Sequence, residues 1–135
     1  MDCLFCKIVR KEIPSHGVYE DDAAFGFLDI HPRSPGHAMV APKIHAETVL
    51  DLPPEATGPL FLAVRAVTGK IASALKPSGF TIGINHGKVS GQTIDHLHIH
   101  VIPRFLGDGG TSLHGVVNNP PDGPLEDLAK KIRNG

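Results

Sequence analysis

The chain has 135 residues, a formal net charge of −1, 41% hydrophobic residues and 20% charged residues. This length suits one domain with a single core and leaves no room for a second catalytic module. The near-zero charge excludes a general electrostatic attraction to nucleic acid or to an anionic membrane. We therefore expect no nucleic-acid or membrane partner, and any phosphate that the protein binds must be held by local groups.

The amino terminus carries charges among its apolar residues and lacks the apolar core of a signal peptide. No apolar run approaches the roughly 20 residues that cross a bilayer. These features predict a cytoplasmic protein, in which the two cysteines of the chain, Cys3 and Cys6, stay reduced. Two thiols at this spacing are more typical of a metal site or a redox pair than of a structural disulfide.

The amino-terminal half predicts a short helix and then a meander of strands. Apolar residues fall on one helical stripe over residues 3–10, before Pro14. Short strands are expected at residues 18–19, 24–30 and 36–41, separated by turns that contain Gly, Pro and acidic residues.

The carboxyl-terminal half predicts one long helix, two strands and a terminal helix. Apolar residues step by three and four over residues 57–76, and Thr57 can cap this helix. Strands are expected at residues 80–85 and 97–103, and the terminal helix at 124–133. Strands joined by tight turns, together with one long helix, imply an α+β domain in which the helix packs on one face of an antiparallel sheet.

Three histidines alternate with apolar residues at the start of the last predicted strand. Alternate side chains of a strand point to opposite faces, so His96, His98 and His100 are expected to share one face. A single histidine in a strand is usually structural, whereas three at a period of two indicate function. From the pattern alone, two interpretations remain open: a metal site built on His-x-His, and a nucleophile supported by its neighbours.

A polar turn, Ser90-Gly91-Gln92-Thr93, leads into these histidines. The backbone at Gly91, the amide of Gln92 and the hydroxyl of Thr93 could hold a phosphate without a net positive charge. A phosphoryl group held by this turn would lie next to His98.

The run from Gly91 to Arg104 reads GQTIDHLHIHVIPR. It resembles the signature of the histidine triad (HIT) family, His-φ-His-φ-His-φ-φ with φ apolar, and the bacterial Hint-like branch with an amino-terminal Cys-x-x-Cys in particular. The resemblance implies a five-stranded antiparallel sheet with one long helix and short terminal helices. It implies a single HIT domain over residues 1–135, with a core at about 3–105 and an extension at 106–135, and commonly a homodimer.

The resemblance also implies roles for individual residues. His98 matches the nucleophile, His100 matches the residue that contacts the phosphate beside it, and Thr93 joins them as a catalytic residue. Asp29 matches an acid that holds the ribose hydroxyls. An apolar slot for the base is expected from Leu4, Phe5, Ile8, Phe27, Leu28 and Ile30, and the polar surroundings of the phosphate from Asn85, Gly91, Gln92 and Thr93.

Elementary chemistry agrees with a histidine nucleophile. A neutral imidazole is nucleophilic near pH 7, because its ordinary pKa is about 6.5. Attack by one ring nitrogen requires the other to hold the proton, so we expect a carbonyl near the Nδ1–H of His98. Hydrogen bonds from His100, Thr93 and backbone N–H groups would stabilise the charge that develops on the phosphate oxygens.

The predicted function is hydrolysis of purine nucleoside phosphoramidates, or related nucleoside monophosphate derivatives, through a nucleotidyl-histidine intermediate. Two alternatives remain open: cleavage of dinucleoside polyphosphates, as in the Fhit-like branch, and nucleotide binding without catalysis. Uridylyl transfer is disfavoured, because that branch has a proline within the triad and a much longer chain.

The spacing Cys3-Leu4-Phe5-Cys6 allows two thiolates to bind one tetrahedral ion, although buried free cysteines or a redox pair remain alternatives. Resemblance to zinc-containing HIT relatives and uridylyltransferases implies His45 and His96 as the other ligands. Such a closed Cys₂His₂ set would be structural, so no catalytic metal is expected. Chelation is expected to lower thermal stability before it lowers catalysis per folded molecule.

Five further histidines are expected to be exposed or to serve as ordinary hydrogen-bonding residues in loops and at strand edges. They are His16, His31, His37, His86 and His114.

Overall fold

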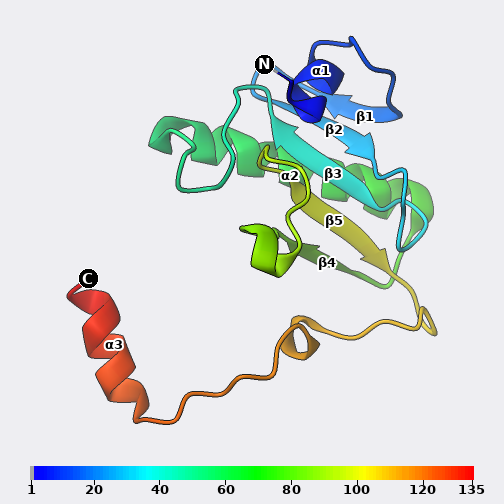
Figure 1. Ribbon diagram of the computed structural model, residues 1–135. Coiled ribbons are helices and arrows are strands. Elements are labelled where there is room, and N and C mark those ends of the chain that lie inside the picture. The colour runs from blue at the N-terminus through cyan, green and yellow to red at the C-terminus, as the bar shows by residue number, and fades with distance from the viewer. Residues whose placement is uncertain (1) are drawn as a thin grey trace.

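A computed structural model of the protein describes residues 2–135, and Met1 lies outside the described residues (Figure 1). Five antiparallel strands form one sheet in the order β1-β2-β3-β5-β4. The predicted α+β fold is confirmed. The elements are α1 (Leu4–Val9), β1 (Gly17–Glu20), β2 (Ala24–Leu28), β3 (Ala38–Pro42), α2 (Pro54–Leu75), β4 (Gly79–Gly83), β5 (Ile99–Arg104) and α3 (Leu125–Arg133), with short 3₁₀ turns at Lys88–Ser90 and Leu113–Gly115.

The central strand β3 is buried on both of its faces. Ala38 and Val40 belong to the core beneath α2, whereas Met39 and Ala41 pack in a second cluster with Phe5 of α1. The period of two along the strand therefore distributes its side chains between two helices. Figure 1 shows the long helix α2 along the sheet and the short helix α1 near the β1 and β2 end.

The long helix begins three residues earlier than the sequence predicts. Pro53 is the N-cap and Pro54 the first helical residue, so the prediction that Thr57 caps the helix is wrong. Proline is favoured at the first position because its φ is already helical and the N–H that it lacks has no partner there. By length and composition α2 could cross a membrane, yet its apolar stripe packs in the core with the sheet.

Strand β5 begins at Ile99, two residues later than predicted, so His96 and His98 precede the strand. The register that pairs Val40 with Ile99 would place Pro42 opposite Leu97. Proline has no N–H to donate, so the ladder ends there. The alternation nevertheless continues backwards, since Leu97 is buried in the α2 core and donates its N–H to the Ala46 carbonyl at 2.7 Å.

The chain beyond about residue 106 leaves the sheet, and α3 lies apart from it (Figure 1). The terminal helix is confirmed at Leu125–Arg133, and none of its residues is buried. Its three large apolar side chains, Leu125, Leu128 and Ile132, are exposed. This arm leaves an apolar helix face without a partner in the described chain.

Candidate active site

A cavity of about 520 Å³ lies between α1, the end of β2 and the segments that flank the histidines. It is lined by all the predicted nucleotide-contacting residues except Gln92. These lining residues are Leu4, Phe5, Ile8, Phe27, Leu28, Asp29, Ile30, Asn85, Gly91, Thr93, His98 and His100, joined by Ile13, Pro14, Ser15, His31, Met39 and Ile94.

His98 is held in the tautomer that nucleophilic attack requires. Its Nδ1 lies 2.7 Å from the His96 carbonyl oxygen, so Nδ1–H donates there and Nε2 keeps its lone pair. The ring is 8% exposed, and the edge-on Phe5 ring lies 4.9 Å away between centroids. Burial lowers the pKa of His98 below 6.5, so the imidazole is neutral near pH 7. The expected carbonyl beside Nδ1 is confirmed.

A chain of hydrogen bonds sets the tautomer of His100. The Arg33 backbone N–H donates to His37 Nδ1 at 3.0 Å, so a neutral His37 carries its proton on Nε2. That proton is donated to His100 Nδ1 at 2.9 Å. His100 therefore carries its own proton on Nε2, as a phosphate-binding donor must.

His37 is a site residue that the sequence analysis assigned to the structural histidines. Its side chain is 3% exposed and makes two of the hydrogen bonds in this chain. The missed signal is a period of two, because His37 shares a face with Met39, and Met39 pairs with His100. The pairing of β3 with β5 had to be known before that signal had meaning.

Burial of His100 is expected to make the folded protein less stable in acid. Burial, then the charges of His98 and His37, lowers the pKa of His100 to about 4 from 6.5. As the pH falls from about 6.5 to about 4, the unfolded chain binds a proton at this histidine that the folded chain does not. We expect the free energy of unfolding to fall over this window in urea titrations. His100→Asn, compared at equal zinc content, is expected to show a smaller fall, and an identical slope would contradict this assignment.

Asp29 lies at the cavity and uses its two oxygens differently. Oδ1 accepts the His31 N–H at 2.9 Å, which fixes the following turn. Oδ2 lies 3.5 Å from His37 Nε2 and 3.9 Å from His100 Nδ1. These three side chains could cluster around an ion. The proton on His37 Nε2 occupies the nitrogen that an ion would need, so a hydrogen-bonded chain describes the cluster better.

In the polar turn, Gln92 makes hydrogen bonds within the loop, whereas Gly91 and Thr93 line the cavity. Gln92 is buried; its Oε1 accepts the Gly87 N–H, and its Nε2 donates to the carbonyls of Glu47 and Ile94. The amide thus orders the loop, and a phosphate contact by Gln92 stays a prediction. Gly91 has a φ of +102°, which favours glycine, and it lines the cavity together with Thr93.

Cys3, Cys6, His45 and His96 bring four ligand atoms within 4.8 Å of one another. His96 Nδ1 lies 3.4 Å from Cys3 Sγ and 3.5 Å from Cys6 Sγ, and His45 Nδ1 lies 3.3 Å from Cys6 Sγ. Tetrahedral zinc bonds place sulfur and nitrogen ligands about 3.6 Å apart, so the set fits this ion. His96 Nε2 donates to the Pro42 carbonyl at 2.9 Å, which leaves Nδ1 free for a metal.

The Cys6 thiol stays protonated near pH 7 unless a cation binds it. Burial, together with the hydrogen bond and the charge of Cys3, raises the pKa of the Cys6 thiol. Two neighbouring thiolates are therefore costly unless a positive ion neutralises them.

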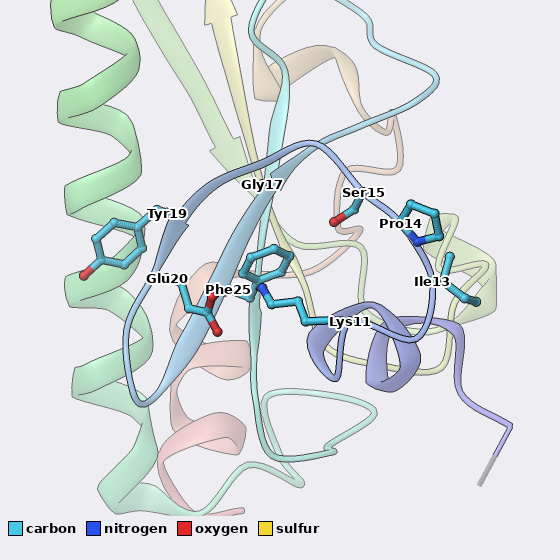
Figure 2. A pocket seen from close by; sticks show the side chains of 8 residues that line it. All are labelled: Lys11, Ile13, Pro14, Ser15, Gly17, Tyr19, Glu20 and Phe25. Carbon is cyan, nitrogen blue, oxygen red and sulfur yellow. Dashed lines mark hydrogen bonds and ion pairs between the residues drawn. The ribbon is translucent and has the colours of Figure 1, made fainter.

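A second hollow of about 440 Å³ lies behind Ile13, Pro14 and Ser15, which also line the main cavity. Figure 2 shows Lys11 reaching toward Phe25, whereas Tyr19 points away toward the long helix. Lys11 Nζ lies 3.7 Å from the ring centroid and 2.9 Å from Glu20 Oε1. Phe25 lines this hollow and stacks on Phe27, which lines the main cavity, so the stacked pair separates the two.

The buried histidine with a free Nε2 at the apolar cavity is His98, the middle one of the three alternating histidines. The family model of the HIT domain matches residues 10–107. The chain belongs to the HIT family. The predicted resemblance to bacterial HIT proteins is confirmed by a Bacillus subtilis relative, 40% identical over 80% of this chain and 75% of the relative, and by solved bacterial structures.

Three relatives show how far the similarity of this HIT protein extends. An uncharacterized HIT-like protein of Methanocaldococcus jannaschii is 39% identical over 131 residues, which cover 97% of this chain and 98% of the relative. An adenosine 5′-monophosphoramidase of Saccharomyces cerevisiae is 38% identical, over 76% of this chain and 62% of the relative. An adenylylsulfatase of Arabidopsis thaliana is 40% identical, over 76% of this chain and 52% of the relative.

Two crystal structures confirm the HIT fold. A member of the HIT family from Bacillus subtilis has a TM-score of 0.89 at 34% identity, over 99% of this chain and 96% of that one. A zinc-bound histidine triad protein from Mycobacterium smegmatis has a TM-score of 0.76 at 33% identity, over 99% and 92%.

Proposed function

We propose that this HIT protein hydrolyses purine nucleoside phosphoramidates, or related derivatives of nucleoside monophosphates, by attack of His98 on the α-phosphorus. The observation that carries the proposal is the hydrogen bond from His98 Nδ1–H to the His96 carbonyl, which leaves Nε2 free at the cavity. Two longer relatives are an adenosine 5′-monophosphoramidase and an adenylylsulfatase, which supports a substrate derived from adenosine 5′-monophosphate.

The reaction proceeds in two displacements. His98 Nε2 forms a bond to the α-phosphorus while the bond from phosphorus to the leaving amine breaks, and the amine leaves with a proton from solvent. Water then attacks the same phosphorus, the phosphorus–nitrogen bond to His98 breaks, and the water releases a proton. The Nε2–H of His100 and the Thr93 hydroxyl donate hydrogen bonds to the phosphoryl oxygens, where a single donor typically contributes about 10²–10³ in rate.

A turnover panel separates this proposal from its alternatives. The panel contains adenosine 5′-phosphoramidate, a dinucleoside triphosphate and a dinucleoside tetraphosphate at equal concentrations. We expect kcat/KM for the phosphoramidate to exceed the others by at least about tenfold, which is about 1.4 kcal/mol of differential transition-state binding. The reverse order would favour dinucleoside polyphosphate hydrolysis. Binding of adenosine monophosphate with no turnover would favour a non-catalytic nucleotide-binding protein.

Asp29 is proposed to bind the ribose. Asp29→Asn keeps the oxygen that the His31 N–H requires but removes the charge, so the turn is expected to survive. We expect the affinity for adenosine monophosphate to fall roughly tenfold to a hundredfold, because a charge-assisted hydrogen bond is worth about 1.5–3 kcal/mol. Calorimetric titrations with the 2′-deoxy nucleotide are expected to show little change.

The matched control for this prediction is Asp22→Asn, at an exposed acidic residue outside the cavity. Its affinity for both nucleotides is expected to equal that of the wild type. Equal losses for the two nucleotides in Asp29→Asn would mean that Asp29 supports the loop instead.

We further propose that the Cys₂His₂ set binds one structural zinc and that no catalytic metal is needed. The ligand distances support this, and a related HIT structure is zinc-bound.

A homodimer is also proposed, because β4 is an edge strand and the apolar face of α3 is exposed. Sedimentation of the full chain measures this assembly. The cytoplasmic location remains part of the proposal.

A further inference from the structure

His96 belongs to both the metal site and the active site. Its imidazole Nδ1 lies 3.4 Å and 3.5 Å from the two cysteine sulfurs, and its backbone carbonyl accepts the His98 Nδ1–H at 2.7 Å. The side chain of His96 is completely buried. One residue therefore joins the ligand set of an ion to the atom that fixes the tautomer of the nucleophile.

The segment at helix α1 is a second connection between the metal site and the nucleotide cavity. Leu4 and Phe5 lie between Cys3 and Cys6 in the sequence, and both line the cavity. The Phe5 ring lies edge-on to His98 at 4.9 Å between centroids. An ion that binds both cysteines thus restrains the two residues that form this wall of the nucleotide cavity.

We propose that the metal site positions the active site, so that zinc binding and nucleotide binding favour each other. His96 is then a positioning residue, and the inference rests on the zinc and the nucleotide cavity proposed above. Without the ion, the imidazole keeps its hydrogen bond to the Pro42 carbonyl and only weak thiol hydrogen bonds to Nδ1, so the restraint on the His96 main chain weakens. Coupling between two sites is reciprocal and typically amounts to a factor of 5–150, so we expect about tenfold.

Zinc release from the loaded protein tests this coupling without requiring a folded metal-free state. Calorimetry first establishes the affinity of adenosine monophosphate for the loaded protein. Zinc transfer to a chromogenic chelator is then followed with and without a saturating concentration of this nucleotide. We expect transfer to slow about tenfold when the nucleotide is bound. An unchanged rate at proven saturation would overturn the proposal.

The state of His98 provides a readout that a purely structural zinc would not move. His45→Ala removes a ligand that is exposed and does not line the cavity, and nitrogen-15 NMR reports the tautomer of each imidazole. We expect a single Nδ1–H tautomer of His98 in the zinc-loaded wild type and a mixture in His45→Ala. His114→Ala, at an exposed histidine of the carboxyl-terminal arm, is the matched control.

The outcomes separate the coupling from the proposed function. A single His98 tautomer in a folded, zinc-depleted His45→Ala protein would overturn the coupling whatever the enzyme does. Slowed zinc release and a changed His98 tautomer, with no turnover of any substrate, would support the coupling and contradict the proposed hydrolase activity. Failure of adenosine monophosphate to bind would contradict the proposal that the cavity binds a nucleotide. The His98 tautomer would then decide whether His96 positions His98.

Discussion

His98→Ala is expected to lower kcat for an adenosine phosphoramidate by at least about a thousandfold, because the variant lacks the attacking nitrogen. His98 lines the cavity and donates one hydrogen bond to a backbone carbonyl. Its loss is therefore expected to cost only about 1–2 kcal/mol of unfolding free energy. Single-turnover assays and urea titrations measure the two effects on the same preparation.

The control for this variant is His114→Ala, which removes an exposed histidine far along the chain from the triad. It is expected to match the wild type in kcat and in stability. More than about a tenth of wild-type activity in folded His98→Ala would contradict the mechanism, since loss of a nucleophile is not a mild effect.

Zinc removal is expected to cause the second large effect, on stability. A ligand that binds only the folded state at a thousand times its Kd adds about 4.1 kcal/mol of unfolding free energy. For a chain of this size, the melting temperature is then expected to fall by roughly 10–20 °C on chelation. Calorimetric scans with and without a chelator measure this fall, and metal analysis is expected to show about one zinc per chain.

Cys3→Ser/Cys6→Ser is the control for the chelator itself. The double variant is expected to melt at the chelated temperature with no further response, because the ion is already absent. A wild type that contains no zinc, or whose melting temperature ignores the chelator, would remove the metal from the account. Because His96 joins the metal site to the active site, zinc removal is also expected to lower the nucleotide affinity of the molecules that remain folded.

The sequence predicts the parts of this fold that depend on periodicity. Alternation places Leu97, Ile99 and Val101 in the core. The spacing of Cys3 and Cys6 allows a metal site, and the family resemblance implies His45 and His96, whose side chains lie beside the two thiols. The boundaries were less predictable, because they depend on single backbone groups. Strand β5 begins late since Pro42 has no N–H, and α2 begins early since Pro54 is preset for a helix.

Connections between distant segments could not be predicted from the sequence. The link from Arg33 through His37 to His100 depends on the pairing of β3 with β5. The hydrogen bonds of Gln92 to Glu47 depend on how two loops pack, and no local pattern encodes them. For the same reason, the two roles proposed for His96 could not be predicted, because they depend on different partners of its ring and of its backbone carbonyl in the folded chain.

The most direct test of the account is the mass of the protein during turnover. Adenosine 5′-phosphoramidate is mixed with the protein in a rapid-quench device, and intact mass spectra are recorded without acid, which would cleave a phosphorus–nitrogen bond. The account predicts a transient gain of one adenylyl group, located by fragmentation on His98 and absent in His98→Ala. Turnover without this adduct, or an adduct on another residue, would contradict the claim that His98 is the nucleophile.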